Sequence, residues 1–153
     1  MATTPQFTYQ ANNQSTKFGS AALTTSDGSG GTIGTNIFLL YTPGANDSYV
    51  EAVRVVPVAS TAASATNATV VRLYRSTVST GSTSTTNTHL LAEIALPATT
   101  ADQTTAAVSW FDIPLGIRLA GSNASTPEFL LVSSHVVNAS NTNLDATAFG
   151  GNY

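Results

Sequence analysis

The stretch TVVRLYRSTVSTGSTSTTNTHLLAEIAL, residues 69–96, decides the fold class of this chain. In residues 69–76, Val71 and Leu73 alternate with polar or aromatic neighbours. In residues 89–96, apolar side chains again occupy every second position, with Glu93 on the opposite face. A period of two is typical of a β-strand with one buried face. The Ser/Thr/Asn/Gly-rich residues 76–88 between these strands predict a long exposed loop.

Similar short apolar runs, separated by clusters of Gly, Pro, Asn and Ser, continue along the chain, and no segment holds a helical i, i+3, i+4 pattern over three turns. We therefore predict an all-β fold, a two-sheet antiparallel sandwich that is jelly-roll-like. The predicted strands are Gln6–Gln10, Asn36–Tyr41, Tyr49–Val58, Thr69–Ser76, His89–Leu96, Ala107–Ile113, Gly116–Ala120, Phe129–Val137 and Ala146–Phe149.

The first part of the chain differs from the rest, because it carries isolated aromatic residues in a Gln, Asn, Thr and Ser background. We predict an extended N-terminal arm over residues 1–34 and a single sandwich domain over residues 35–153. Free arms usually fray, so we expect neighbouring chains to hold this one in place. The aromatic residues predicted to lie at interfaces between chains are Phe7, Tyr9, Phe18, Tyr74 and Tyr153.

The composition argues against several classes of function. Only 8% of the residues are charged, the net charge is −3, and Lys17 is the sole lysine among five basic residues. Such a chain offers no stripe of positive charge to neutralise phosphates, so we expect no nucleic-acid partner. No apolar stretch approaches the roughly 20 residues that cross a bilayer, so we expect no membrane partner. The absence of cysteine excludes disulfides and thiolate chemistry.

Residue types for catalysis occur, but in unconvincing patterns. Ser133, Ser134 and His135, together with Asp112 or Asp145, could supply a Ser/His/Asp set. Adjacent strand residues point to opposite faces, however, so Ser134 and His135 should diverge, and no Gly-x-Ser-x-Gly motif is present. We therefore predict that the chain is not an enzyme and binds no cofactor.

Weak candidates for ligand sites have simpler interpretations. On a strand, His89 and Glu93 would lie about 13 Å apart, too far to bind one metal ion. The spacing of Asn141, Asn143 and Asp145 copies part of a calcium loop, but a polar turn explains it better, and no metal site is predicted. The Gly-rich residues 28–31 read as a turn rather than a phosphate cradle. For Trp110, packing in the core or at an interface is favoured over a sugar-stacking platform.

Four segments carry a resemblance to a known group of proteins: TPGANDSYVE (42–51), LAEIALPATTA (91–101), IPL (113–115) and AFGGNY (148–153). The chain resembles, over about residues 35–153, the small decoration or cement proteins of tailed-phage virions. This resemblance implies a jelly-roll protomer, commonly a homotrimer, on the outer surface of the capsid. The implied partner is the major capsid protein, whose capsomer contacts it would stabilise. The interface aromatics would then contact the capsid or another copy of the chain.

A second interpretation remains open. A phage tail or fibre domain, or a glycan-binding β-sandwich, could use Ser/Thr/Asn-rich loops and Trp110 instead. That function would require an exposed aromatic side chain beside polar groups in a concave site. For the favoured interpretation as a cement protein we expect a homo-oligomer on the outer surface of the capsid, made in the host cytoplasm.

Overall fold

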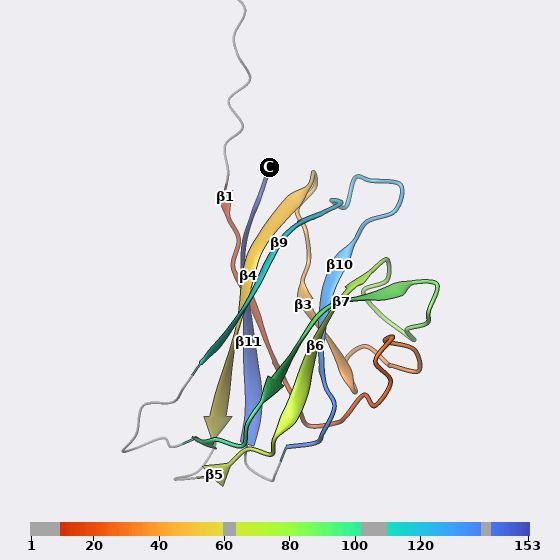
Figure 1. The fold of residues 1–153 in the computed structure, drawn as a ribbon. Helices are drawn as coiled ribbons and strands as arrows, with labels where there is room; N and C mark the ends of the chain where they lie inside the picture. Colours follow the sequence, from red (N-terminus) through yellow and green to blue (C-terminus); the bar gives the residue numbers. More distant parts are fainter. Residues whose placement is uncertain (1–9, 60–63, 102–109, 139–141) are drawn as a thin grey trace, which may run out of the picture.

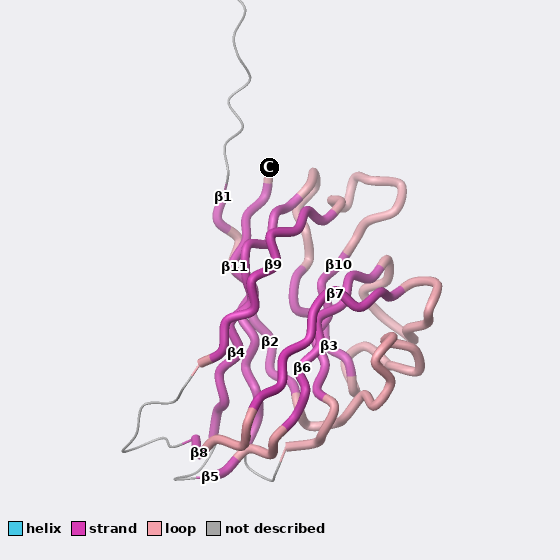
Figure 2. Tube along the Cα trace, viewed as in Figure 1, coloured by secondary structure: helices cyan, strands magenta, loops and turns pink. Residues whose placement is uncertain are grey.

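The computed structural model describes residues 10–59, 64–101, 110–138 and 142–153. All the regular structure in these residues is β, and no helix occurs among them (Figure 2). Two antiparallel sheets face one another and form a sandwich (Figure 1). The prediction of an all-β sandwich is therefore confirmed.

The two main sheets contain the long strands. The order of the five-stranded sheet is β1-β11-β4-β9, with β2 also paired to β11, and the order of the four-stranded sheet is β3-β10-β6-β7. The first sheet contains β1 (Gln10–Ala11), β2 (Gln14–Phe18), β4 (Ser48–Ala59), β9 (Phe111–Leu119) and β11 (Thr142–Asn152). The second contains β3 (Ile37–Tyr41), β6 (Thr69–Ser76), β7 (Thr88–Leu96) and β10 (Phe129–Ser134), and a small pair joins β5 (Ser64–Ala65) to β8 (Thr100–Ala101).

The main core fills the space between the two sheets, where the alternation seen in the sequence directs every second side chain inward. In β11, for example, Leu144, Ala146 and Ala148 are buried while the residues between them are half-exposed. They pack with buried residues of the facing sheet such as Leu73 and Val132. Small alanines on β11 allow the larger side chains opposite to fill the interior at normal protein density.

Two predicted strands, Ala107–Ile113 and Gly116–Ala120, merge into the single strand β9; the first part of the former lies outside the described residues. The register with β4 shifts beside Pro114, and Gly116 has a positive φ of 62°. An edge strand tolerates both features, since proline has no N–H for a ladder and glycine adopts positive φ readily. What the sequence indicated as a break is therefore a β-bulge.

The predicted arm needs correction, because much of residues 10–34 belongs to the sandwich. Strand β2 pairs with β11, and the Phe18 side chain is 1% exposed in the main core. The Gln14 side-chain amide donates to the Thr42 carbonyl (2.7 Å) and accepts from the Thr42 N–H (2.9 Å), as a strand backbone would. Of the predicted first strand, only Gln10 is described, where it begins β1.

After β2, the chain crosses the outer face of the four-stranded sheet. Leu23 donates its N–H to the Ser134 carbonyl and packs with Ile37, Tyr74 and Leu131 in a second, smaller apolar cluster. The loop after β6 was predicted to be exposed, but part of it packs against the segment that follows β2. Thr83 in this loop is buried, and its hydroxyl donates to the Gly28 carbonyl (2.6 Å). We call residues 19–36 the strap. It belongs to the fold of this chain.

Candidate interaction surfaces

The sandwich is closed along one side and open along the other. On the β2–β3 side, Phe18 and Leu40 are buried and Gln14 bridges the two sheets. On the opposite side lie β7 and β9, each paired on one side only among the described residues. Inward-facing apolar side chains there are only half-buried. We call this strip of Leu91, Ala92, Ile94, Phe111, Leu115 and Ile117 the open seam.

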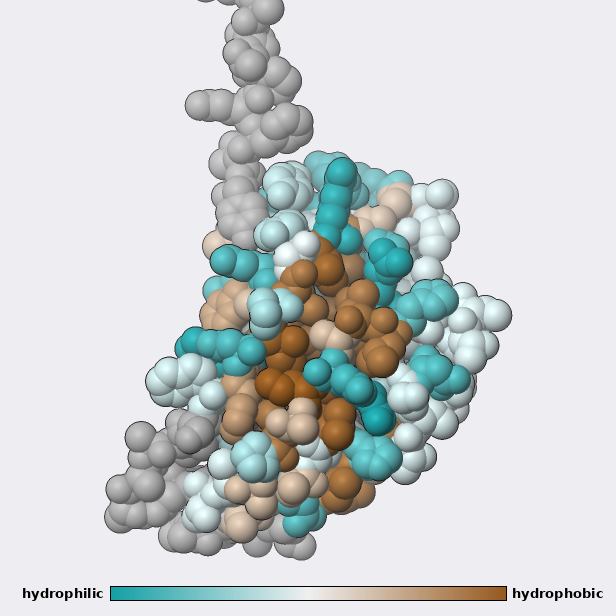
Figure 3. All heavy atoms as spheres, in the orientation of Figure 1, coloured by the Kyte–Doolittle hydropathy of each residue, from teal (hydrophilic) through white to brown (hydrophobic). Residues whose placement is uncertain are grey.

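The open seam is long enough to matter for association. Each of its strands has nine residues, which corresponds to roughly 30 Å of length. Figure 3 shows hydrophobic side chains gathered on this face, over β9 and β7, with polar residues around them. Contiguous apolar surface of this kind, together with strand edges that no described residue pairs, is typical of sites of protein contact.

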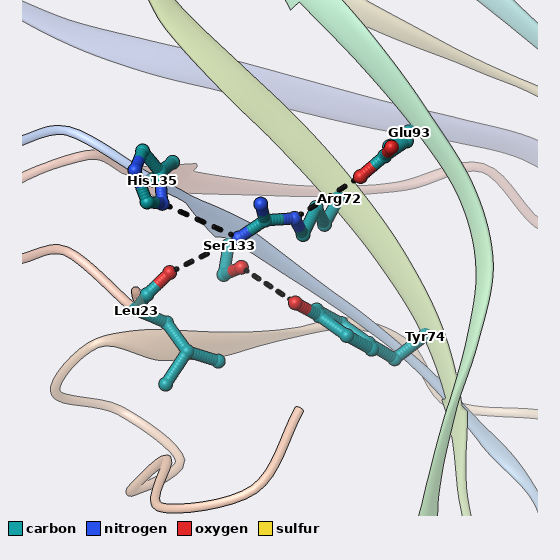
Figure 4. Close-up of polar contacts among 6 residues, drawn as sticks. All are labelled: Leu23, Arg72, Tyr74, Glu93, Ser133 and His135. Carbon is teal, nitrogen blue, oxygen red and sulfur yellow. Dashed lines mark hydrogen bonds and ion pairs between the residues drawn. The ribbon is translucent and has the colours of Figure 1, made fainter. Parts of the chain in front are cut away.

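A polar cluster on the outer face of the four-stranded sheet holds the strap (Figure 4). The Arg72 side chain is almost fully buried; its Nε donates to Glu93 Oε2 (3.2 Å) and its Nη1 to the Leu23 carbonyl (3.4 Å). Nη1 also lies 3.5 Å from His135 Nδ1. The guanidinium thus clamps a main-chain carbonyl of the strap against the sheet.

The serines beside His135 do not contact it. The Ser133 Oγ lies 3.4 Å from Tyr74 Oη, and the Ser134 Oγ is buried without a hydrogen-bond partner. Burial raises the pKa of Tyr74 above its ordinary value, so this phenol stays neutral. The contacts of Arg72 in this cluster fasten the strap to the sheet.

The predicted interface aromatics divide into three groups. Phe18 and Tyr74 are corrected to core positions, because both side chains are buried within this chain and have no surface to offer a partner. Tyr153 is 46% exposed and borders an open hollow with Asp47 and Arg118, which form an ion pair. Phe7 and Tyr9 lie outside the described residues.

The described members of the weak metal candidates have other contacts, and Asn141 lies outside the described residues. Glu93 binds Arg72, whereas His89 lies opposite Arg75 in the ladder. Asp145 has a buried Oδ1 without a hydrogen-bond partner, and burial raises the pKa of this carboxyl, an effect that the charge of Lys17 opposes. No group of three or more His, Cys, Asp or Glu side chains in the described ranges could hold a metal ion.

Trp110 lies at the surface, so of the two expected positions, core or interface, the core is excluded. Its side chain is 59% exposed, and the Arg54 guanidinium lies over its ring at 5.2 Å from the centroid. The same guanidinium lies 5.7 Å from the Phe149 ring centroid. In addition, Arg54 Nε and Nη2 donate to the two carboxylate oxygens of Asp112 at 2.8 and 2.9 Å. We call Arg54, Trp110, Asp112 and Phe149 the aromatic clamp.

The aromatic clamp adjoins an open depression on the outer face of the five-stranded sheet. The depression is lined by Glu51, Ala52, Arg54, Asp112, Pro114 and Phe149. These residues come from β4, β9 and β11, which are neighbours in space but not in sequence. Sequence reasoning missed this constellation, because only the ladder register places Arg54 opposite Asp112.

No helix in the described ranges is long and apolar enough to cross a membrane. No protein-family model and no curated protein sequence matches the chain. Among solved structures, the chain is similar to a chain of the cyanophage Pam1 capsid asymmetric unit, with 11% sequence identity and a TM-score of 0.43. That alignment covers 100% of this chain and 92% of the other.

Proposed function

We propose that this chain is a structural virion protein of a tailed bacteriophage, a head decoration or cement protein. In this role it binds the major capsid protein on the outer surface of the capsid and stabilises contacts between capsomers. It acts as a homo-oligomer, most simply a trimer. The motifs of residues 35–153 that resemble phage decoration proteins support the proposal, and the open seam carries it.

The topology supports the jelly-roll part of this proposal. The eight strands of at least five residues fall into two sheets of four, β2-β11-β4-β9 and β3-β10-β6-β7. Among these eight, every connection between consecutive strands passes from one sheet to the other, except the one from β6 to β7. Two interlocked Greek keys of this kind are what a jelly roll requires.

The charges of the described chain favour contact by shape and hydrogen bonding. Each of the four arginines forms an ion pair with a carboxylate of the same chain: Arg54 with Asp112, Arg72 with Glu93, Arg75 with Glu128 and Arg118 with Asp47. Little unbalanced charge is left to repel identical copies. A surface of this type suits dense packing of many copies on one particle.

The open seam is best covered by a second copy of this chain. A strip roughly 30 Å long and about 10 Å wide gives on the order of 300 Å² per copy, or at most about 15 kcal/mol for the area of two copies at ~25 cal/mol per Å², because the side chains in it are already half-buried. Association costs roughly 4–15 kcal/mol, so the strip at most balances this cost. Contacts around the seam and with the capsid then add net stability. Summed over many symmetric copies, weak contacts reinforce a shell strongly.

The first test measures the oligomer. Light scattering of the purified protein should give three times the 15.7 kDa mass of the chain. Ile117→Glu places a charge in the open seam and should yield monomers with an unchanged circular dichroism spectrum. Val136→Glu, at an exposed valine outside the seam, is the matched control and should leave the oligomer intact. A wild-type protein that is monomeric at every concentration contradicts the self-association.

The second test measures the cement function. Particles of the phage that carries this gene, stripped of the protein, should bind it again in a co-sedimentation assay and then resist heating better. Ile117→Glu should bind more weakly than Val136→Glu, because monomers lose multivalent attachment. If stripped particles do not bind the wild-type protein, or gain no heat resistance from it, the cement function is wrong.

A further inference from the structure

We propose that the depression beside the aromatic clamp binds a neutral pyranose sugar. The site lies on the outer face of the five-stranded sheet, whereas the open seam lies along one edge of the sandwich. Sugar binding is therefore an activity beyond the proposed structural role. It does not depend on that role, because a single chain supplies all the residues involved.

The position of the clamp follows from the ladder register. Arg54 on β4 lies opposite Asp112 on β9 and opposite Thr147 on β11. Phe149 lies two residues further along β11, on the same face as Thr147 because side chains alternate. Arg54 therefore occupies the middle strand of three, with an aromatic ring and a carboxylate on its flanks. Its guanidinium is held by two cation–π contacts and two hydrogen bonds, which leaves it little freedom.

The hydrogen-bonding groups of the clamp are only partly used. Arg54 Nη1 carries two N–H groups, and no described residue accepts from them. Each Asp112 oxygen accepts one bond from Arg54 and has a second lone pair. The Arg54 hydrogen bond lowers the pKa of Asp112, so it remains a carboxylate acceptor at neutral pH. Glu51 adds a second, exposed carboxylate at the rim.

This chemistry fits a sugar ring. A pyranose presents an apolar C–H face, which packs on exposed aromatic surface, and a rim of hydroxyls that both donate and accept. Phe149 and Pro114 supply apolar surface inside the depression, and the exposed Trp110 lies beside it against Arg54. Arg54 and Asp112 supply a donor and an acceptor side by side. The depression has a volume of about 600 Å³, within the roughly 300–1,000 Å³ range of small-molecule sites.

Charge selects among sugars. Arg54, Asp112 and Glu51 together carry one positive and two negative charges. An acidic sugar or a phosphate would meet this excess of negative charge, whereas a neutral pyranose would not. Because the depression is open, we expect weak binding by one chain. Repetition of the site over many copies would raise the apparent affinity.

The test uses the fact that Trp110 is the only tryptophan of the chain, so its fluorescence reports on this site alone. The probes are methyl α-D-glucopyranoside, methyl α-D-mannopyranoside and methyl β-D-galactopyranoside. Sorbitol is the control, because it has hydroxyls but no ring face. We expect a saturable emission change with at least one pyranoside and only a linear, non-saturating change with sorbitol. No saturable change with any pyranoside overturns the proposal.

Variants separate this site from a general surface effect. Asp112→Asn and Arg54→Lys should each raise the dissociation constant at least tenfold. The matched control, Asp47→Asn, breaks an ion pair beside a different hollow and should leave binding unchanged. Arg54 and Asp112 are exposed and Asp47 is partly exposed, so the loss of either ion pair costs little stability. Trp110→Ala has no tryptophan, so its sugar binding is measured by saturation-transfer NMR. If this variant binds the sugar as tightly as the wild type does, the proposal is overturned.

A protein partner for the same surface gives a different result. If Trp110→Ala weakens co-sedimentation with phage particles while no pyranoside binds the wild-type chain, the aromatic clamp contacts a protein of the particle and the sugar proposal is wrong. If pyranosides bind and particle attachment is unchanged, the sugar site is independent of the cement function. The failure of one proposal is thus distinguishable from the failure of the other.

Discussion

Truncation of Phe18 to alanine tests whether residues 10–34 belong to the fold. The Phe18 side chain is 1% exposed and packs in the main core at the end of β2. Removal of a buried phenylalanine ring costs about 3–5 kcal/mol, from lost transfer free energy and the cavity left behind. Domains of this size have about 5–15 kcal/mol of stability in total, so Phe18→Ala should remove a large share of it.

The assay is urea unfolding followed by circular dichroism, at one fixed protein concentration because oligomers couple stability to concentration. Ser15→Ala is the matched control, since Ser15 is an exposed residue on the same strand and its loss should change stability by less than about 0.5 kcal/mol. An unchanged midpoint in Phe18→Ala would mean that β2 is not docked and that residues 10–34 are a free arm after all.

Three further substitutions test other parts of the structure. Arg72→Met removes the hydrogen bond from Arg72 to the Leu23 carbonyl of the strap. It should lower the free energy of unfolding in urea by about 1.5–3 kcal/mol, the range for hydrogen bonds of charged groups, and an unchanged free energy of unfolding would contradict this role of Arg72. Because burial raises the folded-state pKa of Asp145, the contribution of this carboxyl to stability is greatest below the unfolded pKa near 3.8 and is lost as the pH rises through the folded pKa. Asp145→Asn should therefore raise Tm at pH 7 and leave it unchanged at pH 3, and an equal effect at both pH values would refute the assignment. Gly121→Ala should lower Tm far more than Gly81→Ala in thermal unfolding, because a Cβ at Gly121 would overlap a main-chain oxygen of the β3–β4 loop. A Cβ at Gly81 would enter open space, so its only cost is the strain of alanine at a positive φ.

The sequence predicted strand bounds best where one face of the strand is buried and the other is exposed to solvent. β6 was predicted with its observed bounds, and β7 begins one residue earlier than predicted. Their alternation is strong because both strands cover the main core. β2 was missed, since QSTKF lacks apolar alternation and the strand forms because β11 offers it an edge and Phe18 fills the core. Tertiary pairing there overrides local preference.

The interaction surfaces were harder to predict, because they depend on strand order. Trp110 was expected in the core or at an interface, and the structure places it at the surface, where Arg54 of β4 lies over its ring. Tyr74 was expected at an interface, and the strap covers it instead. In both cases a segment distant in sequence decides whether an aromatic side chain is exposed or buried, and the local sequence pattern does not predict which segment packs there.

The position of β11 governs the order in which this protein can fold. β11 is the last described strand in sequence, yet it lies inside its sheet, paired with β4 on one side and with β1 and β2 on the other. Until it is synthesised, β4 exposes a bare ladder edge and β2 has no strand to join. Such long-range pairing makes folding slow, on the order of milliseconds to seconds. Nascent chains that stop short of β11 therefore present the edge of β4, which favours aggregation until β11 is made and pairs with it.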